Sequence, residues 1–121
     1  MTGDRLEPGD MLLVHLPGHV PPGHEQEGVR LAVVLGVPPE PVRFGVVLVA
    51  PATTRAGQWA RRNPLLYPRL PAGAGGLRRP STILLDQVRA LDLQRTVEYL
   101  GTLAPTELEM IRRGLRALLN L

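Results

Sequence analysis

Three short runs rich in Val and Leu decide the fold: MLLVHL at residues 11–16, VRLAVVL at 29–35 and FGVVLV at 44–49. Pro and Gly bound each run, which is typical of buried strands separated by turns. The run at 64–70 contains two prolines and is at best an edge strand, whereas STILLDQV at 81–88 predicts a further strand. We therefore expect a β-sheet over the first part of the chain.

The hydrophobic period changes to a helical one near the C-terminus. Pro105 and Glu107 suit the first turn of a helix. Apolar residues then recur at spacings of three and four: Leu108, Ile111, Leu115 and Leu118. A shorter helix is expected over residues 92–100. Strands first and helices last predict an α+β fold, a small, strongly bent antiparallel barrel capped by the last helix.

Length and composition limit the classes of protein to be considered. The 121 residues, 44% of them hydrophobic, suffice for one core, so we expect a single domain over 1–121. The apolar runs are too short to cross a bilayer, and the N-terminus lacks a signal pattern, so a soluble cytoplasmic protein is expected. The chain has no cysteine, which excludes disulfides, thiolate metal sites and thiol nucleophiles.

The charge of the chain is unevenly distributed. All 14 basic residues are Arg, so phosphate loops and Schiff bases that depend on Lys are excluded. Residues 41–85 contain seven Arg and no acidic residue, whereas the remainder has seven Arg and all eleven acidic residues. This basic segment predicts a nucleic-acid partner, because the planar guanidinium binds two phosphate oxygens at once; a solvated basic face is the alternative.

Two polar loops are expected to frame any site. Residues 17–28 (PGHVPPGHEQEG) join the first two strands, and residues 53–63 (TTRAGQWARRN) follow the third. His15, His19 and His24 do not predict a metal site, since no further ligand completes the set. The stretch GAGG at 73–76 predicts a tight surface turn rather than a phosphate cradle.

Side chains suited to phosphodiester cleavage gather beside these loops. They are His24, Glu25 and Arg30 around the end of the first loop, and Thr53, Thr54 and Arg55 at the start of the second. Cleavage of RNA without a metal needs a base for the 2′-OH proton, an acid for the leaving 5′-oxygen, and groups that stabilise the charged phosphorane. The combination indicates an RNA-cleaving site, although each residue taken singly also has a structural interpretation.

The chain resembles the MazF/PemK-type toxins, ribosome-independent mRNA endoribonucleases of toxin–antitoxin systems. The family's first strand is similar to PGDMLLVHLP at 8–17, and its signature G-x-E-Q-x-G-x-R-P-[AV]-V-[VL] to GHEQEGVRLAVVL at 23–35. Its V-P-[IC]-T motif is similar to APATT at 50–54, and a later segment to residues 70–95. Four motifs in the same order carry the resemblance nearly from end to end.

The resemblance implies an SH3-like barrel, a homodimer, and RNA in a groove at the dimer interface. It also implies sequence-specific cleavage, without metal or cofactor, that leaves a 2′,3′-cyclic phosphate and a 5′-hydroxyl. Arg30 matches the signature arginine of the family, which acts in proton transfer and charge stabilisation. Thr53 matches the threonine that stabilises the phosphorane. Glu25 matches a carboxylate implicated in activity, and His24 replaces a commoner Ser. Which of His24, Glu25 and Arg30 is the base stays open.

Seven further residues are expected to bind RNA: Gln26, Thr54, Arg55, Trp59, Arg61, Arg62 and Gln87. Trp59 is the one ring placed to stack on a base, and a packing role is an equal alternative. Asp86 matches the acid of the family's D-Q motif. Because Leu84 stands where the PemK branch has an Arg, a structural role for Asp86 is favoured.

The resemblance also implies a protein partner. Antitoxins of the family lay a disordered, acidic C-terminal tail along the RNA groove, and the basic segment suits such a tail, so the tail and single-stranded RNA are expected to compete. The alternative function is a non-catalytic SH3-like module that binds gyrase or nucleic acid. Gyrase-directed relatives end in Trp-Gly-Ile, whereas this chain ends in LLNL at 118–121.

Overall fold

The computed structural model describes residues 5–121, and residues 1–4 of the expected domain lie outside the described residues. The strands are β1 (Asp10–Leu16), β2 (Gly28–Gly36), β3 (Val46–Thr53), β4 (Arg69–Leu70), β5 (Ser81–Ile83), β6 (Arg89–Asp92) and β7 (Thr96–Thr102). The helices are α1 (Gln58–Arg62) and α2 (Pro105–Leu119), and short 3-10 turns are η1 (Ala74–Gly76), η2 (Leu85–Gln87) and η3 (Leu93–Arg95).

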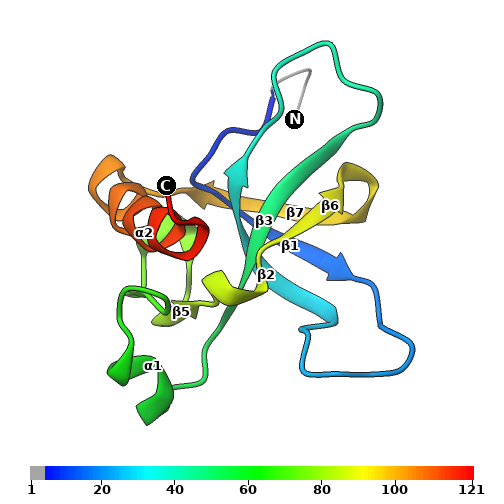
Figure 1. Ribbon diagram of the computed structural model, residues 1–121. Coiled ribbons are helices and arrows are strands. Elements are labelled where there is room, and N and C mark those ends of the chain that lie inside the picture. The colour runs from blue at the N-terminus through cyan, green and yellow to red at the C-terminus, as the bar shows by residue number, and fades with distance from the viewer. Residues whose placement is uncertain (1–4) are drawn as a thin grey trace.

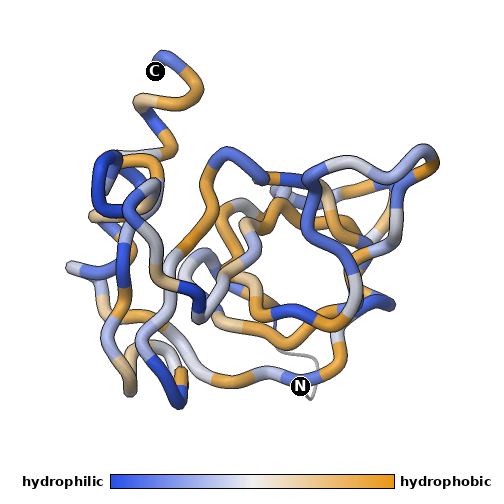
Figure 2. The backbone as a smooth tube through the Cα atoms, turned by 90° about the horizontal axis from the view of Figure 1, so that it is seen from below, coloured by the Kyte–Doolittle hydropathy of each residue, from blue (hydrophilic) through white to orange (hydrophobic). Residues whose placement is uncertain are grey.

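One antiparallel sheet runs in the order β4-β5-β3-β2-β1-β7 (Figure 1). Strand β3 changes partner along its length, since Val46–Val49 pair with β6 and Ala52–Thr53 pair with β5. The sheet curls into a half-barrel, seen as a ring beside α2 in Figure 2. The expected strongly bent antiparallel barrel with a C-terminal helix is confirmed.

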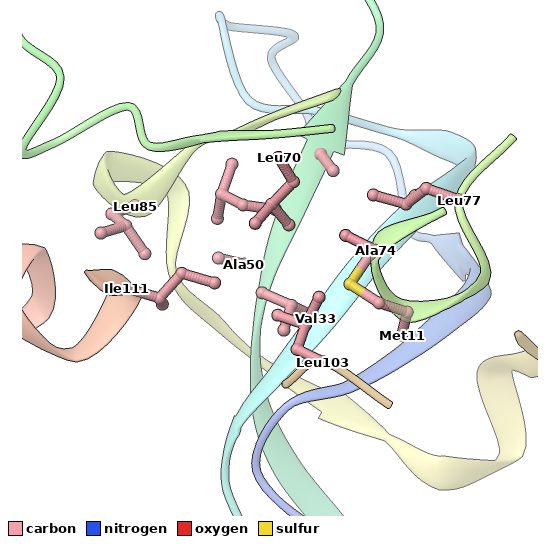
Figure 3. Close-up of a cluster of buried hydrophobic side chains, with 11 residues drawn as sticks. Met11, Val33, Ala50, Leu70, Ala74, Leu77, Leu85, Leu103 and Ile111 are labelled. Carbon is pink, nitrogen blue, oxygen red and sulfur yellow. The ribbon is translucent and has the colours of Figure 1, made fainter. Parts of the chain in front are cut away.

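Both faces of the sheet are covered with apolar side chains. Alternate residues of each strand point to opposite faces, so neighbours such as Met11 and Leu12 enter different clusters. One cluster fills the curl of the sheet and contains Leu12, Val14, Leu16, Ala32, Val34, Val47, Val49 and Leu91. The other cluster, shown in Figure 3, contains Met11, Val33, Ala50, Leu70, Leu85, Leu103 and Ile111. This double burial explains why the strands are almost continuously apolar.

The helix expected over 92–100 is wrong, because most of that segment belongs to β7. Strand β7 pairs with β1 from Asp10–Thr102 to Val14–Thr96 and satisfies the backbone groups along the edge of β1. Its Thr, Val and Tyr side chains favour extended backbone. The strand expected over 81–88 is also shorter than expected, since it ends at Ile83, and the turn η2 and strand β6 follow.

The glycine-rich stretch at 73–76 forms a turn as expected, but this turn is not a surface feature throughout. Ala74 and Gly75 are buried, and a side chain at Gly75 would collide with Met11 and Leu103. Gly75 also has a positive φ of 55°, which favours glycine. The turn therefore closes one end of the core shown in Figure 3.

The helix expected from Pro105 is confirmed as α2. Its N-cap residue, Ala104, has no side-chain acceptor, but its backbone N–H donates to the carboxylate of Glu107 at 2.9 Å. Asn120 ends the helix in the left-handed conformation, with φ of 59°. Ile111 of α2 packs into the core beside Leu85 of η2. Among the helices of residues 5–121, none is both long and apolar enough to cross a membrane.

Candidate functional site

The register of the sheet brings Arg30 and Thr53 to the same end of adjacent strands. The last pair of the β2–β3 ladder joins Leu31 to Ala52, and Arg30 precedes this pair while Thr53 follows it. Residues opposite each other in an antiparallel pair point to the same face. Arg30 and Thr53 are therefore neighbours on one face, with Arg30 exposed and Thr53 half-buried.

Local hydrogen bonds orient both side chains. Nε of Arg30 donates to the carbonyl of Glu27 at 3.0 Å. This hydrogen bond orients the guanidinium, so that a ligand would be bound through its two terminal nitrogens. Oγ1 of Thr53 accepts from the backbone N–H of Arg55 at 3.1 Å, so its own proton can be donated to a ligand. In residues 5–121, neither side chain takes part in an ion pair. The pair is suited to hold a phosphate.

The polar row continues across the sheet to a residue that the sequence analysis did not single out. Thr53 pairs with Thr82 of β5, and Thr82 pairs with Arg69 of β4. Thr82 is fully buried and its Oγ1 accepts from the Arg69 guanidinium at 2.8 Å. A second arginine thus lies in the row with Thr53 and Arg30. No motif marks Arg69, because its position depends on strand pairing.

The first loop is held against η2 and β6 by two side chains. Gln87 accepts from the backbone N–H of Gln26 at 2.6 Å and donates to the carbonyl of His24 at 3.2 Å. Arg89 donates to the carbonyl of Gln26 at 3.2 Å. Between the loop and β6 lies a cavity of about 340 Å³, lined by His19, Glu25, Gln87, Val88, Arg89 and Ala90.

The catalytic residues expected from the sequence are brought together only in part. Arg30 and Thr53 are adjacent, and the hydrogen bond from Arg30 to Glu27 joins them to the loop that carries His24 and Glu25. In the described part of the chain, no hydrogen bond or ion pair connects the side chain of His24 or Glu25 to Arg30 or Thr53. The catalytic roles of His24 and Glu25 stay predictions.

The second loop contains the short helix α1. Trp59 of α1 is 46% exposed and meets Tyr67 edge-to-face, with ring centroids 5.0 Å apart. The Tyr67 hydroxyl donates to the Asp86 carboxylate at 2.6 Å, and this hydrogen bond, with lesser effects of burial and of the Asp86 charge, raises the pKa of Tyr67 above 10.0. Trp59 thus packs on one edge and stays exposed elsewhere, and Asp86 has the structural contact that was favoured.

The arginines of the basic segment divide between the two ends of β3. Arg43 lies before β3 and stacks on Phe44, with 4.8 Å from guanidinium carbon to ring centroid. Arg55, Arg61 and Arg62 follow β3 in the chain, the last two on α1, and Arg69 lies in the row with Thr53. A second cavity, of about 390 Å³, is lined by Thr54, Arg78, Arg79, Leu13, Leu31, Gly76, Leu77, Ser81, Glu98 and Leu100. Most of the basic segment therefore lies at the end of the sheet that carries Arg30 and Thr53.

Metal-ligating side chains are not clustered in residues 5–121. No group of three or more His, Asp or Glu is placed to hold a metal ion there. At the end of the sheet that carries Arg30 and Thr53, the guanidinium and hydroxyl groups are suited to bind a negatively charged group.

The curled half-barrel with a C-terminal helix is the architecture of MazF-type toxins. The family model described as "PemK-like, MazF-like toxin of type II toxin-antitoxin system" matches residues 7–119, so the chain belongs to this family. No curated protein sequence matches the chain.

Three solved structures of similar proteins come from Deinococcus radiodurans. Crystal form I of MazF is 27% identical, with a TM-score of 0.73, and the match covers 96% of this chain and 97% of that one. A MazE-MazF structure, form II, is 28% identical with a TM-score of 0.67, and covers 96% of both chains. A third, MazE-MazF form III, is 25% identical with a TM-score of 0.64, and covers 96% and 97%.

Proposed function

We propose that this chain is one endoribonuclease domain that acts as a toxin. It cleaves single-stranded mRNA at a specific sequence, independently of the ribosome and without a metal ion. Members of its family are known as endoribonucleases. The observation that carries the proposal is the placement of Arg30 and Thr53 on one face, at one end of β2 and β3, beside most of the basic segment.

The proposed reaction begins with removal of the 2′-OH proton by a base. The 2′-oxygen then attacks the neighbouring phosphorus, and the bond from phosphorus to the 5′-oxygen breaks as that oxygen takes up a proton. The products are a 2′,3′-cyclic phosphate and a 5′-hydroxyl. Arg30 and the Thr53 hydroxyl stabilise the negative charge of the phosphorane, and His24, Glu25 or Arg30 transfers the protons.

The bound RNA follows the loops on either side of this pair. Arg55, Arg61 and Arg62 neutralise phosphates, and the exposed part of the Trp59 ring stacks on a base. Thr54 and Gln26 contact the RNA nearby. The contacts to bases, rather than those to phosphates, set which sequence is cut.

We further propose a cytoplasmic homodimer that is neutralised by an antitoxin. The crystal structures of MazE-MazF show that similar chains occur with such a partner. A disordered acidic tail suits the arginines after β3, because its carboxylates replace the phosphates of RNA. The tail and RNA then exclude each other.

The proposal is tested by incubating the purified chain with a long single-stranded RNA in the presence of EDTA and mapping the fragment ends. Cleavage is expected at one short sequence with cyclic phosphate ends. Arg30→Ala and Thr53→Ala should each lower the cleavage rate by about 10²-fold, as is usual when a donor to a transition-state oxyanion is removed. The exposed residues Arg112 and Thr106 of α2 provide matched controls, since Arg112→Ala and Thr106→Ala should retain full activity.

Two results would contradict the proposal. Equal cleavage by wild type and the Arg30→Ala variant would show that the site is elsewhere. Binding of RNA by a folded sample that never cleaves it, over several RNA sequences, would instead favour the non-catalytic binding module. The proposed competition between the antitoxin and RNA is tested by adding an acidic antitoxin-tail peptide. This addition should distinguish a groove that the tail and RNA share from separate binding sites.

A further inference from the structure

We propose that Gln87 and Arg89 are positioning residues that hold the backbone of residues 24–26, and thereby fix the position of His24 and Glu25 in the loop that leads to Arg30. The catalytic consequence rests on the proposed ribonuclease function. The placement of the loop does not, because it is a property of the free protein.

The first loop has little means of holding its own shape. Pro17, Pro21 and Pro22 have no backbone N–H, and in the described part of the chain residues 17–27 make no backbone–backbone hydrogen bond outside the strand ladder. The hydrogen bonds to its backbone come from three side chains: Gln87, Arg89 and Arg30.

The Gln87 carboxamide acts on the loop as a peptide group of a neighbouring strand would. Its oxygen accepts from the N–H of Gln26 and its nitrogen donates to the carbonyl of His24, so one planar group engages both sides of Glu25. Arg89 adds a donor to the carbonyl of Gln26. The backbone before and after Glu25 is therefore tied to β6 and η2.

Both side chains that hold the loop stand on well-packed elements. Gln87 ends the turn η2, whose Leu85 is fully buried against the core that contains Ile111. Arg89 begins β6 and pairs with Val49 of β3. The packed core thus determines where the loop lies, which is the usual way in which a site acquires its geometry.

These contacts assign Gln87 a different role from the RNA contact expected from its motif. Its oxygen and one N–H are already bound to the loop, so binding RNA through the same atoms would release residues 24–26. Two roles are thus distinguishable: an RNA contact acts only when RNA is present, whereas a positioning residue acts in the free protein.

The structural part is tested by hydrogen exchange of the Gln26 backbone amide in the free protein, measured by NMR. Gln87→Met keeps the size of the side chain and removes both hydrogen bonds, so the Gln26 amide should exchange about tenfold faster, the factor that corresponds to one hydrogen bond. Gln87→Glu keeps an acceptor for Gln26 and should retain slow exchange. Gln94→Met is the matched control, because Gln94 is exposed on η3.

The catalytic part is tested by steady-state cleavage of RNA with the same variants. Gln87→Met should lower kcat by 10- to 100-fold, in the range known for small displacements of catalytic groups, with little change in KM, and Gln87→Glu should lie between it and wild type. Unchanged exchange at Gln26 with a raised KM would overturn the proposal and make Gln87 an RNA contact. If the wild-type chain cleaves no RNA, the proposed function fails, while the exchange experiment still decides whether Gln87 holds the loop.

Discussion

At the residue scale, the contact between Tyr67 and Asp86 shows how a motif residue can serve the fold. The Asp86 carboxylate accepts from the Tyr67 hydroxyl, and Tyr67 in turn contacts Trp59 of α1. This chain of contacts fixes the helix that carries three expected RNA-binding residues, Trp59, Arg61 and Arg62. Asp86 therefore supports the site from a distance.

This contact predicts a specific dependence of stability on pH. The hydrogen bond raises the pKa of Tyr67 above 10.0, so the folded state holds this proton more tightly than the unfolded state does. The stabilisation is fully present below about pH 10, the pKa of a free tyrosine, and is lost as the pH rises through the folded pKa. Because the pair is exposed, Tyr67→Phe should cost at most about 1 kcal/mol at neutral pH.

Urea unfolding of wild type and Tyr67→Phe at neutral and alkaline pH measures this effect. The difference in the free energy of unfolding should shrink above pH 10. A difference that stays constant with pH would show that the hydroxyl packs without donating to Asp86.

At the element scale, Gly114 allows α2 to lie directly against the chain segment before β4. A side chain at this position would collide with the carbonyl oxygen of Leu65 and with the side chain of Leu85. Helix propensity alone favours Ala over Gly by about 1 kcal/mol, so it predicts that Gly114→Ala stabilises the protein. The packing of Gly114 predicts the opposite effect on stability.

We expect Gly114→Ala to destabilise the protein, because forcing extra volume into a packed contact costs about 1–3 kcal/mol. The control is a substitution at the N-cap of the same helix, which is expected to stabilise the protein. Ala104→Ser places a hydroxyl at the N-cap and should stabilise α2 by about 1 kcal/mol. Thermal unfolding of both variants measures the effects, and a higher melting temperature for Gly114→Ala would show that α2 is not in contact with Leu65.

At the scale of the whole molecule, strand β3 separates Arg43 from the arginines of the basic segment that follow the strand. The eight residues of β3 span about 25 Å, which is about three times the screening length of about 8 Å at physiological salt. Arg43 before the strand and Arg61 after it are both exposed and alter the net charge equally. They should nevertheless differ in their effect on RNA.

Charge reversal at these two positions separates location from net charge. Arg61→Glu should weaken binding of single-stranded RNA and lower its salt dependence, because about 0.7 counterion is released for each phosphate that is neutralised. Arg43→Glu should leave both nearly unchanged. Titration of a labelled oligonucleotide at several salt concentrations measures the two quantities. Equal losses in the two variants would indicate long-range attraction by net charge alone.

Much of the architecture follows from local sequence. The Val- and Leu-rich runs around Met11–Leu16 and Val29–Leu35 form strands, and the period after Pro105 forms α2. The helix expected over 92–100 was wrong although the Thr, Val and Tyr side chains of β7 favour extended backbone. The pairing of β7 with β1 settles its conformation, and β1 is too far away in sequence for a local pattern to show this pairing.

The sequence by itself determined the residue types available for function: arginine as the cation, no cysteine, and the motifs around Arg30 and Thr53. Only the tertiary structure decided which of them meet. The β2–β3 register makes Arg30 and Thr53 neighbours and adds Arg69 to their row, and the fold brings Gln87 to a loop 61 residues earlier in the chain. The physical reason is that strand pairing and side-chain hydrogen bonds join residues by position in space, which spacing along the chain does not encode.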